Sequence, residues 1–249
     1  MNSIDKILKL IEELDDHSIN TELKTVWDKV WGKTSYADFR LYKTMDKIKI
    51  LQDLGVDFYN KKVLDIGCGD GSLLLLLQKF FNIQGVGIDI SEEAIISGED
   101  NGLNELGIEL KLGDHRNLSS IQDNSFDIVL SFGVIEHLEE YLLAINEARR
   151  VLKTNGILVL IQPHLLSFGN IQKKYLQLTR RWNFGFQRDF SFLYYKKIIM
   201  ASGFNEIKIY TKRPYVDMKI CRFFDTIIMK IYKYWGHYLY IICKKYDNK

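Results

Sequence analysis

The stretch KVLDIGCGDG, residues 62–71, decides the fold predicted for this chain of 249 residues. An apolar run that begins at Lys62 passes directly into three glycines at alternate positions, Gly67, Gly69 and Gly71. Glycine is needed where a strand turns sharply into a helix and where bare backbone must approach a ligand. The stretch therefore predicts a buried strand, a ligand-binding loop and the start of a helix.

Strand-like and helix-like segments alternate after this loop. Short apolar runs predict five more strands, over residues 84–90, 108–114, 125–133, 157–163 and 206–213, and a last one over 237–245. Helical spacing predicts helices over residues 72–81, 92–106, 138–153 and 191–204. Ser91 is the expected N-cap of the second helix, and Asn155-Gly156 the turn before the fifth strand. This alternation is typical of a doubly wound, mostly parallel α/β sheet.

The domain organisation follows from the same pattern. We predict a helical N-terminal extension over residues 1–60, in which Trp27 and Trp31 either form a lid or pack in a core. The main domain covers residues 61–249, with a substrate cap built from about 165–191 and 213–235.

Composition and charge narrow the class of protein. Hydrophobic residues make up 47% of the chain and the net charge is +2, which gives no electrostatic argument for binding nucleic acid. Cys68, Cys221 and Cys243 lie far apart and predict neither a disulfide framework nor a zinc site. With no signal-like or membrane-spanning segment in the sequence, we expect a cytoplasmic protein without a metal.

An acidic residue follows the glycines at an informative distance. Asp89 comes twenty residues after Gly69, at the tip of the second strand, where a carboxylate can accept hydrogen bonds from both hydroxyls of a ribose. Two cofactors fit. NAD prefers a third glycine at the position of Ser72, whereas S-adenosylmethionine suits Asp65, whose carboxylate can hold the cationic amino end of the methionine.

Five ordered segments resemble the motifs of class I S-adenosylmethionine-dependent methyltransferases. They are VLDIGCGDG, GVGIDIS, the pair Gly113-Asp114, SFDIVLSFGVIEHL and LKTNGILVLIQP. The resemblance covers about residues 60–165. Within this class, the segments are most similar to the methyltransferase type 11 group, which includes the ubiquinone-biosynthesis O-methyltransferases. It is specific for cofactor and fold but says little about the methyl acceptor.

The resemblance implies a seven-stranded sheet whose last strand is antiparallel, and S-adenosylmethionine as cofactor. It also implies that residues of the loop and of the strand ends bind the methionine, the ribose and the adenine. These cofactor-binding residues are Asp65, Gly67, Cys68, Gly69, Gly71, Asp89, Ile90, Asp114, His115, Ser131 and Phe132.

Methyl transfer to a small-molecule acceptor, with oxygen as the acceptor atom, is the expected reaction. His137 follows the fourth strand and is the candidate general base, oriented by Glu136. Its alternative interpretation is structural, as a helix cap or a partner of a backbone carbonyl. His164 either borders the acceptor pocket or is a solvated loop residue.

Two further patterns leave alternatives open. Arg180, Arg181 and Arg188 lie among aromatic residues and either hold a substrate or form a packed surface loop. In residues 218–235, Lys and Arg fall in one narrow helical stripe and nearly all other residues are apolar. Such a segment is buried, makes a homodimer contact or lies on a membrane surface, and burial or a dimer is the default.

Three other function classes are weighed against this one. A non-catalytic module would keep the glycine loop but lack an accessible acceptor pocket. An NAD-dependent oxidoreductase is disfavoured by Ser72 and by the absence of a Tyr-x-x-x-Lys pair. A nucleic-acid methyltransferase is disfavoured by the balanced charge and by the absence of an Asn-Pro-Pro-Tyr-like segment.

Overall fold

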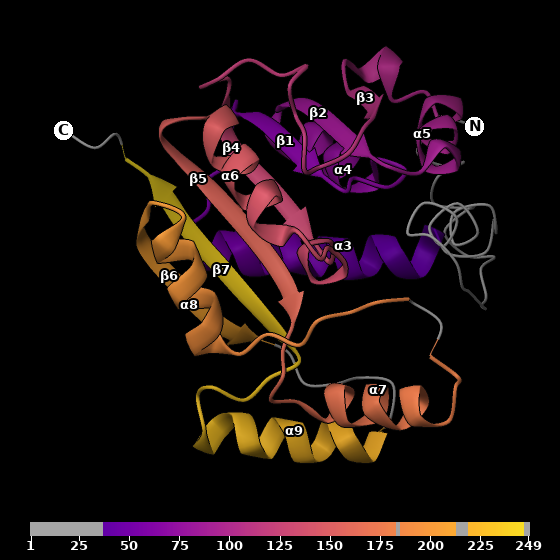
Figure 1. Cartoon of the computed structure of the whole chain (residues 1–249). Coiled ribbons are helices and arrows are strands. Elements are labelled where there is room, and N and C mark those ends of the chain that lie inside the picture. Colours follow the sequence, from indigo (N-terminus) through magenta and orange to yellow (C-terminus); the bar gives the residue numbers. More distant parts are fainter. Residues whose placement is uncertain (1–36, 183–184, 213–218, 247–249) are drawn as a thin grey trace. The chain divides into compact units, whose positions relative to one another are not determined.

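The structure, a computed structural model, describes residues 37–182, 185–212 and 219–246 (Figure 1). The strands are β1 (Lys62–Ile66), β2 (Gln84–Asp89), β3 (Glu109–Leu112), β4 (Phe126–Phe132), β5 (Leu152–Pro163), β6 (Phe204–Lys212) and β7 (Tyr238–Lys245). The helices are α3 (Ala37–Asp53), α4 (Ser72–Phe81), α5 (Glu92–Asp100), α6 (Tyr141–Val151), α7 (Phe168–Leu178), α8 (Phe192–Ala201) and α9 (Lys219–Ile231), with 3-10 turns η1 (Asn104–Leu106) and η2 (Ile135–His137).

The strands form a seven-stranded sheet in the order β3-β2-β1-β4-β5-β7-β6. β7 runs antiparallel to both of its neighbours, β5 and β6, and the pairs β1–β2, β2–β3 and β4–β5 are parallel. This is the mostly parallel sheet with an antiparallel last strand that the sequence predicted. The chain divides into two compact units, residues 1–115 and 116–249, which are described in turn.

In the first unit, helices α4 and α5 pack against the sheet strands β1, β2 and β3. Five consecutive leucines of α4, residues 73–77, are all buried, whereas Lys79 and Phe80 near the end of the helix are exposed. The Ser91 hydroxyl caps α5 by accepting from the Ala94 N–H at 3.2 Å, as predicted. The helix is shorter than predicted, because the chain turns at Gly102, with φ of 76°, and resumes as η1.

Gly98 lets α5 pack directly against the glycine loop. A Cβ atom at this position would lie 2.8 Å from the carbonyl oxygen of Asp70 and 2.3 Å from a methyl carbon of Leu110. The leucine side chain can move, whereas the Asp70 carbonyl belongs to the backbone of the loop. The close approach of helix and loop therefore depends on the missing side chain.

Gly98→Ala is expected to destabilise the protein, although alanine is the better helix former. Overpacking a tight site of this kind costs about 1–3 kcal/mol, which outweighs the gain of about 1 kcal/mol in helix propensity. Urea unfolding of both proteins measures the difference, with Glu99→Ala on the exposed side of the same helix as control. A stabilised Gly98→Ala variant would contradict the close packing.

The second unit contributes β4, β5, β6 and β7 to the sheet. Helix α6 packs against β5, and helix α8 packs against β6. α6 ends at Val151, as β5 already starts at Leu152, five residues before the strand predicted over 157–163. Asn155, at the predicted turn, has a φ of 64°, so this turn lies within β5 and the strand begins irregularly.

Two cap helices of the second unit differ from expectation. The sequence did not predict α7, which begins after Ser167, whose hydroxyl accepts from the Asn170 N–H at 3.2 Å. α9 is helical, as the periodicity of residues 218–235 predicted. The prediction that its apolar side is buried is wrong. Phe223 and Ile231 are 61% and 82% exposed. No helix in the described ranges is long and apolar enough to span a bilayer.

The predicted N-terminal extension is seen only in part. Its last section contains α3, a helix as expected. Residues 1–36, with Trp27 and Trp31, lie outside the described residues, so the extension and its lid stay predictions.

Candidate functional site

The glycine loop follows the carboxyl end of β1 in the first unit. Gly67, Gly69 and Gly71 have φ angles of 75°, 55° and 72°, in the left-handed region that favours glycine. The N–H groups of Gly67 and Cys68 donate to the carbonyl of Ile88, at 2.7 and 3.1 Å. The loop is thereby tied to the end of β2.

Asp89 connects the loop to the segment that follows β2. One carboxylate oxygen accepts from the Gly69 N–H at 2.7 Å, and the other accepts from the Ser91 N–H at 2.9 Å. The side chain is buried. A carboxylate has about four acceptor sites, so Asp89 keeps capacity for the hydroxyls of a ligand.

The loop is strongly acidic. Burial, and then the charge of Asp89, raises the pKa of the Asp65 carboxyl to about 7, while Lys47 opposes the shift. Burial also raises the pKa of the Cys68 thiol, with further contributions from Asp65, Asp89 and Asp70. Three carboxyl groups therefore surround one short loop. Such a place favours a ligand with a positive charge and repels the pyrophosphate of a dinucleotide.

The other predicted residues of the first unit follow the ends of β2 and β3. Ile90 follows Asp89 and is half-buried. The Gly113 N–H donates to the Asp89 carbonyl at 2.8 Å, which joins the end of β3 to the same place. Asp114 and His115 come next, the first half-buried and the second buried.

In the second unit, Ser131 and Phe132 end β4 as predicted. Ser131 is buried, and its hydroxyl has no hydrogen-bond partner within the parts of the chain that the structure describes. A buried hydroxyl without a partner is costly, so it favours a ligand that supplies one. Phe132 is half-buried.

His137 ends the 3-10 turn η2. Its Nδ1 atom lies 2.7 Å from the carbonyl oxygen of Phe186, which can only accept, so Nδ1 carries the proton and Nε2 carries a lone pair. Burial lowers the pKa of the imidazole to about 4. The hydrogen bond to the Phe186 carbonyl acts in the opposite direction, and the positive charge of Lys173 lowers the pKa further. His137 is therefore neutral near pH 7, with its proton on Nδ1.

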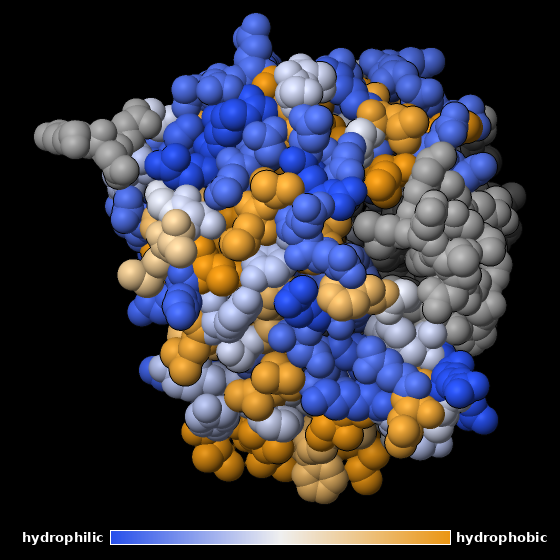
Figure 2. All heavy atoms as spheres, in the orientation of Figure 1, coloured by the Kyte–Doolittle hydropathy of each residue, from blue (hydrophilic) through white to orange (hydrophobic). Residues whose placement is uncertain are grey.

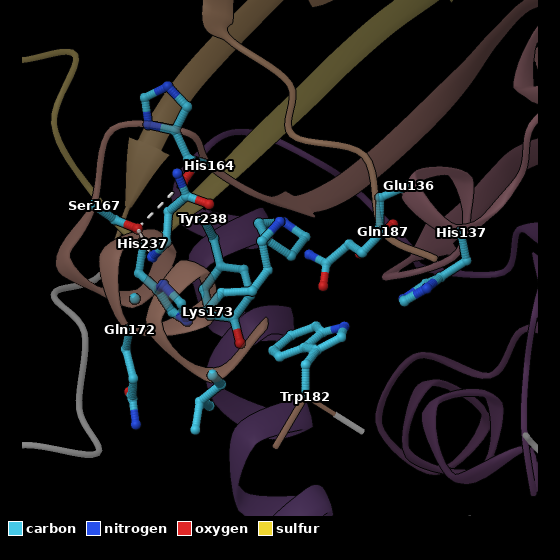
Figure 3. A pocket seen from close by; sticks show the side chains of 14 residues that line it. Glu136, His137, His164, Ser167, Gln172, Lys173, Trp182, Gln187, His237 and Tyr238 are labelled. Carbon is cyan, nitrogen blue, oxygen red and sulfur yellow. Dashed lines mark hydrogen bonds between the residues drawn. The ribbon is translucent and has the colours of Figure 1, made fainter. Parts of the chain in front are cut away.

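His137 lines a cavity of about 350 Å³ in the second unit (Figure 3). We call it the β5–α7 pocket, because β5 ends at it and α7 supplies five of its lining residues. Its lining residues are Glu136, His137, Pro163, His164, Ser167, Gly169, Asn170, Gln172, Lys173, Leu176, Trp182, Gln187, His237 and Tyr238. Figure 3 shows the His137 ring pointing toward Trp182 and Gln187, whereas the His164 ring points away from them.

Polar contacts hold the wall of the β5–α7 pocket in place. The amide of Gln162, with its nitrogen toward Glu136, donates to the buried Glu136 carboxylate. The Glu136 carbonyl accepts from the Arg188 N–H at 2.7 Å. The buried Lys173 pairs with Asp189. The wall is therefore charged and hydrogen-bonded, a feature that the sequence did not reveal.

Trp182 supplies an aromatic surface to the same pocket. Its indole N–H donates to the carbonyl of Gly185 at 3.0 Å, which fixes the orientation of the ring. The Lys173 ammonium lies 6.0 Å from the ring centroid. The sequence marked Trp182 only as one aromatic residue in a cap region.

The three arginines of the cap do not line this pocket. Arg180 and Arg181 are exposed. The Arg188 guanidinium lies 5.2 Å from the Tyr141 ring centroid and 5.6 Å from that of Phe186. Among the three, Arg188 has the packing role that was one of the two alternatives. His164 is buried, so its interpretation as a solvated loop residue is wrong.

Comparisons with known proteins agree with this fold. A model of the methyltransferase domain family matches residues 64–160. The demethylmenaquinone methyltransferase of Staphylococcus haemolyticus is 27% identical over 78% of this chain and 87% of its own length. A S-adenosylmethionine-dependent methyltransferase from Archaeoglobus fulgidus has the same fold, with 22% identity, a TM-score of 0.60, and coverage of 81% of this chain and 93% of that one.

A further structure with this fold comes from Haemonchus contortus. It is phosphoethanolamine N-methyltransferase 2 in complex with S-adenosyl-L-methionine. The identity is 14% and the TM-score is 0.64, over 92% of this chain and 61% of that one.

Asp65→Asn tests the buried carboxyl through the pH dependence of stability. Because the pKa of Asp65 is raised to about 7 in the folded protein, the folded state holds a proton that the unfolded state has released. The free energy of unfolding should thus decrease, by a few kcal/mol at most, as the pH rises from about 4 to about 7. The variant should lose this decrease and be the more stable protein above pH 7.

Urea unfolding at a series of pH values measures the effect. Asp57→Asn, at an exposed carboxylate, is the control and should follow the wild type. Parallel pH profiles for the wild type and Asp65→Asn would contradict a raised pKa at this carboxyl.

Proposed function

Because the chain is a class I S-adenosylmethionine-dependent methyltransferase, we propose that it methylates a small hydroxylated aromatic acceptor, at oxygen, in the β5–α7 pocket. The observation that carries the proposal is the neutral His137 imidazole, which is oriented by the Phe186 carbonyl and lines a pocket with an aromatic wall. Relatives named demethylmenaquinone methyltransferases support a quinol-like acceptor.

The first unit would hold the cofactor. Asp89 has acceptor capacity left for ribose hydroxyls, and Ile90 would pack against the adenine, with Asp114 and His115 near its amino group. Asp65 would pair with the ammonium of the methionine moiety. Gly67, Cys68, Gly69 and Gly71 would offer backbone to the methionine and the ribose. Ser131 and Phe132, at the end of β4, are assigned to the methionine by the resemblance, and the unpartnered Ser131 hydroxyl supports a ligand contact.

The acidity of the loop is the argument for this cofactor over NAD. The methionine moiety of S-adenosylmethionine carries an ammonium and a sulfonium against one carboxylate, so the cofactor has a net positive charge and no phosphate. A positive charge near Asp65 and Asp89 relieves their mutual repulsion. A pyrophosphate in the same place would add negative charge to three carboxyl groups. The loop chemistry therefore fits the methyl donor.

Titration of the protein with S-adenosylhomocysteine tests the cofactor. We expect binding in the micromolar range, of about −8 kcal/mol. Asp89→Ala should lose it, because the variant removes the ribose acceptor and the brace on Gly69. Glu93→Ala, exposed on α5, should bind normally, and a melting curve should show that Asp89→Ala is folded. NADH binding in place of S-adenosylhomocysteine would overturn the proposal.

The chemistry requires one proton transfer and one displacement. Bound S-adenosylmethionine would supply an activated methyl group, whose carbon–sulfur bond breaks as the bond to the acceptor oxygen forms. The hydroxyl proton would pass to Nε2 of His137, and the sulfur keeps the electron pair of the broken bond. The Phe186 carbonyl would hold the imidazole in the tautomer that accepts this proton and would stabilise the imidazolium.

The acceptor would lie against the Trp182 ring. The indole is fixed by its bond to Gly185, and Pro163, Leu176 and Tyr238 add further apolar surface. An aromatic ring stacked on a fixed indole gains about 0.5–1.5 kcal/mol beyond burial of its area. Gln187, from the other side, would hydrogen-bond a ring oxygen.

His137→Asn separates the base from its structural role. The asparagine amide keeps a donor for the Phe186 carbonyl but has no basic nitrogen in place of Nε2. We expect kcat to fall by roughly a hundredfold or more, with unchanged affinity for S-adenosylhomocysteine. The remaining activity should rise with pH, because hydroxide must then remove the proton.

Transfer of labelled methyl to a soluble naphthoquinol measures this activity. Gln172→Ala, in the same pocket, is the control and should change KM but not the pH profile. A His137→Asn enzyme with wild-type kcat and pH profile would show that His137 has only a structural role.

The acceptor atom is tested on the product of the same reaction. Removal of a ring hydroxyl proton raises electron density on oxygen and on adjacent ring carbons, so both are nucleophiles in a quinol. We expect the proton spectrum of the product to contain a methoxy signal. A ring-methyl signal instead would correct the acceptor atom to carbon and leave the cofactor and the base in place.

A further inference from the structure

The exposed side of α9 combines apolar and cationic residues. Ile220, Phe223 and Ile231 are 62%, 61% and 82% exposed, and Phe224 and Ile227 are also exposed. Lys219, Arg222 and Lys230 are exposed as well. They follow one neighbouring stripe of the helix, with Lys219 and Arg222 about one turn apart and Lys230 about two turns further on. Figure 2 shows hydrophobic residues gathered along the edge of the molecule where Figure 1 shows α9.

The one acidic residue of α9 is removed from this surface. Asp225 is completely buried, and its carboxylate accepts a hydrogen bond from the indole N–H of Trp235. All charged side chains that α9 exposes are thus cationic. α7 lies along the same side in Figure 1, and it contains no acidic residue and exposes Tyr175, Leu178 and Lys174.

We propose that α9 docks the enzyme on an anionic lipid surface. Three sides of the helix fit this role. The first side, which contains Asp225, is buried against the rest of the second unit. The second side exposes aromatic and aliphatic side chains, and the stripe between these two sides is cationic. A helix of this kind lies in the plane of the bilayer surface, with its apolar side in the acyl boundary and its Lys and Arg at anionic head groups.

A second copy of the chain fits this surface less well. Around a two-fold axis the same stripe meets itself, and Lys219, Arg222 and Lys230 would then approach three identical cations. An anionic head-group layer satisfies them instead. The inference does not depend on the proposed acceptor, because lipid binding is measured without methyl transfer.

Cosedimentation of the full-length protein with vesicles tests docking. We expect binding to vesicles that contain phosphatidylglycerol and much weaker binding to pure phosphatidylcholine, with a decrease at high salt. Phe223→Ser with Ile227→Ser should abolish binding. Arg222→Gln and Lys230→Gln should each weaken it about fivefold, as expected for one cation at an anionic surface.

A matched control separates docking from general hydrophobicity. Leu142→Ser with Leu143→Ser removes two exposed apolar side chains from α6 of the same unit and should leave vesicle binding unchanged. All variants should keep the wild-type melting temperature, which shows that they fold. Absence of binding to anionic vesicles, or equal loss in the α6 control, would overturn the proposal. So would a dimer that the α9 variants dissociate in the absence of lipid.

Discussion

The hydrogen bonds between the Asp89 carboxylate and the N–H groups of Gly69 and Ser91 are the constraint on which the first unit depends. A buried carboxylate is stable only when it is well hydrogen-bonded, and backbone donors can surround it only if the loop comes close. Glycines with positive φ give the loop that freedom, and Gly98 gives α5 the space to pack beside it. One side chain thus fixes both the loop and the start of α5.

The same carboxylate affects the electrostatics of its surroundings. Asp89 helps to raise the pKa of Asp65 to about 7, so the loop contains a carboxyl group that is only partly ionised near pH 7 and that a nearby positive charge would ionise further. Under the proposed function, cofactor choice would depend on charge more than on shape, since the strand–glycine–helix arrangement is shared with dinucleotide-binding proteins. Ser72, which counted against NAD in the sequence, donates its hydroxyl to Asp70 and so belongs to this acidic network.

The sequence predicted well what local interactions decide. Alternating strands and helices, the Ser91 cap and the position of Asp89 all follow from patterns within a few tens of residues. It could not predict that His137 bonds Phe186, forty-nine positions away, or that Lys173 pairs with Asp189. Nor could the periodicity of residues 218–235 reveal which side of α9 is covered, because that depends on tertiary packing.

This contrast has a physical basis in how the glycine loop and the β5–α7 pocket are built. The glycine loop is held by backbone hydrogen bonds and by one carboxylate, so many sequences with the right glycines can form it. The β5–α7 pocket is made of side chains that hold each other in place, with Gln162 on Glu136, Phe186 on His137 and Gly185 on Trp182. A change in any of these alters the shape of the pocket without affecting the sheet. Acceptor specificity can therefore change while the fold and the cofactor stay the same, which is why motifs that identify the fold do not identify the acceptor.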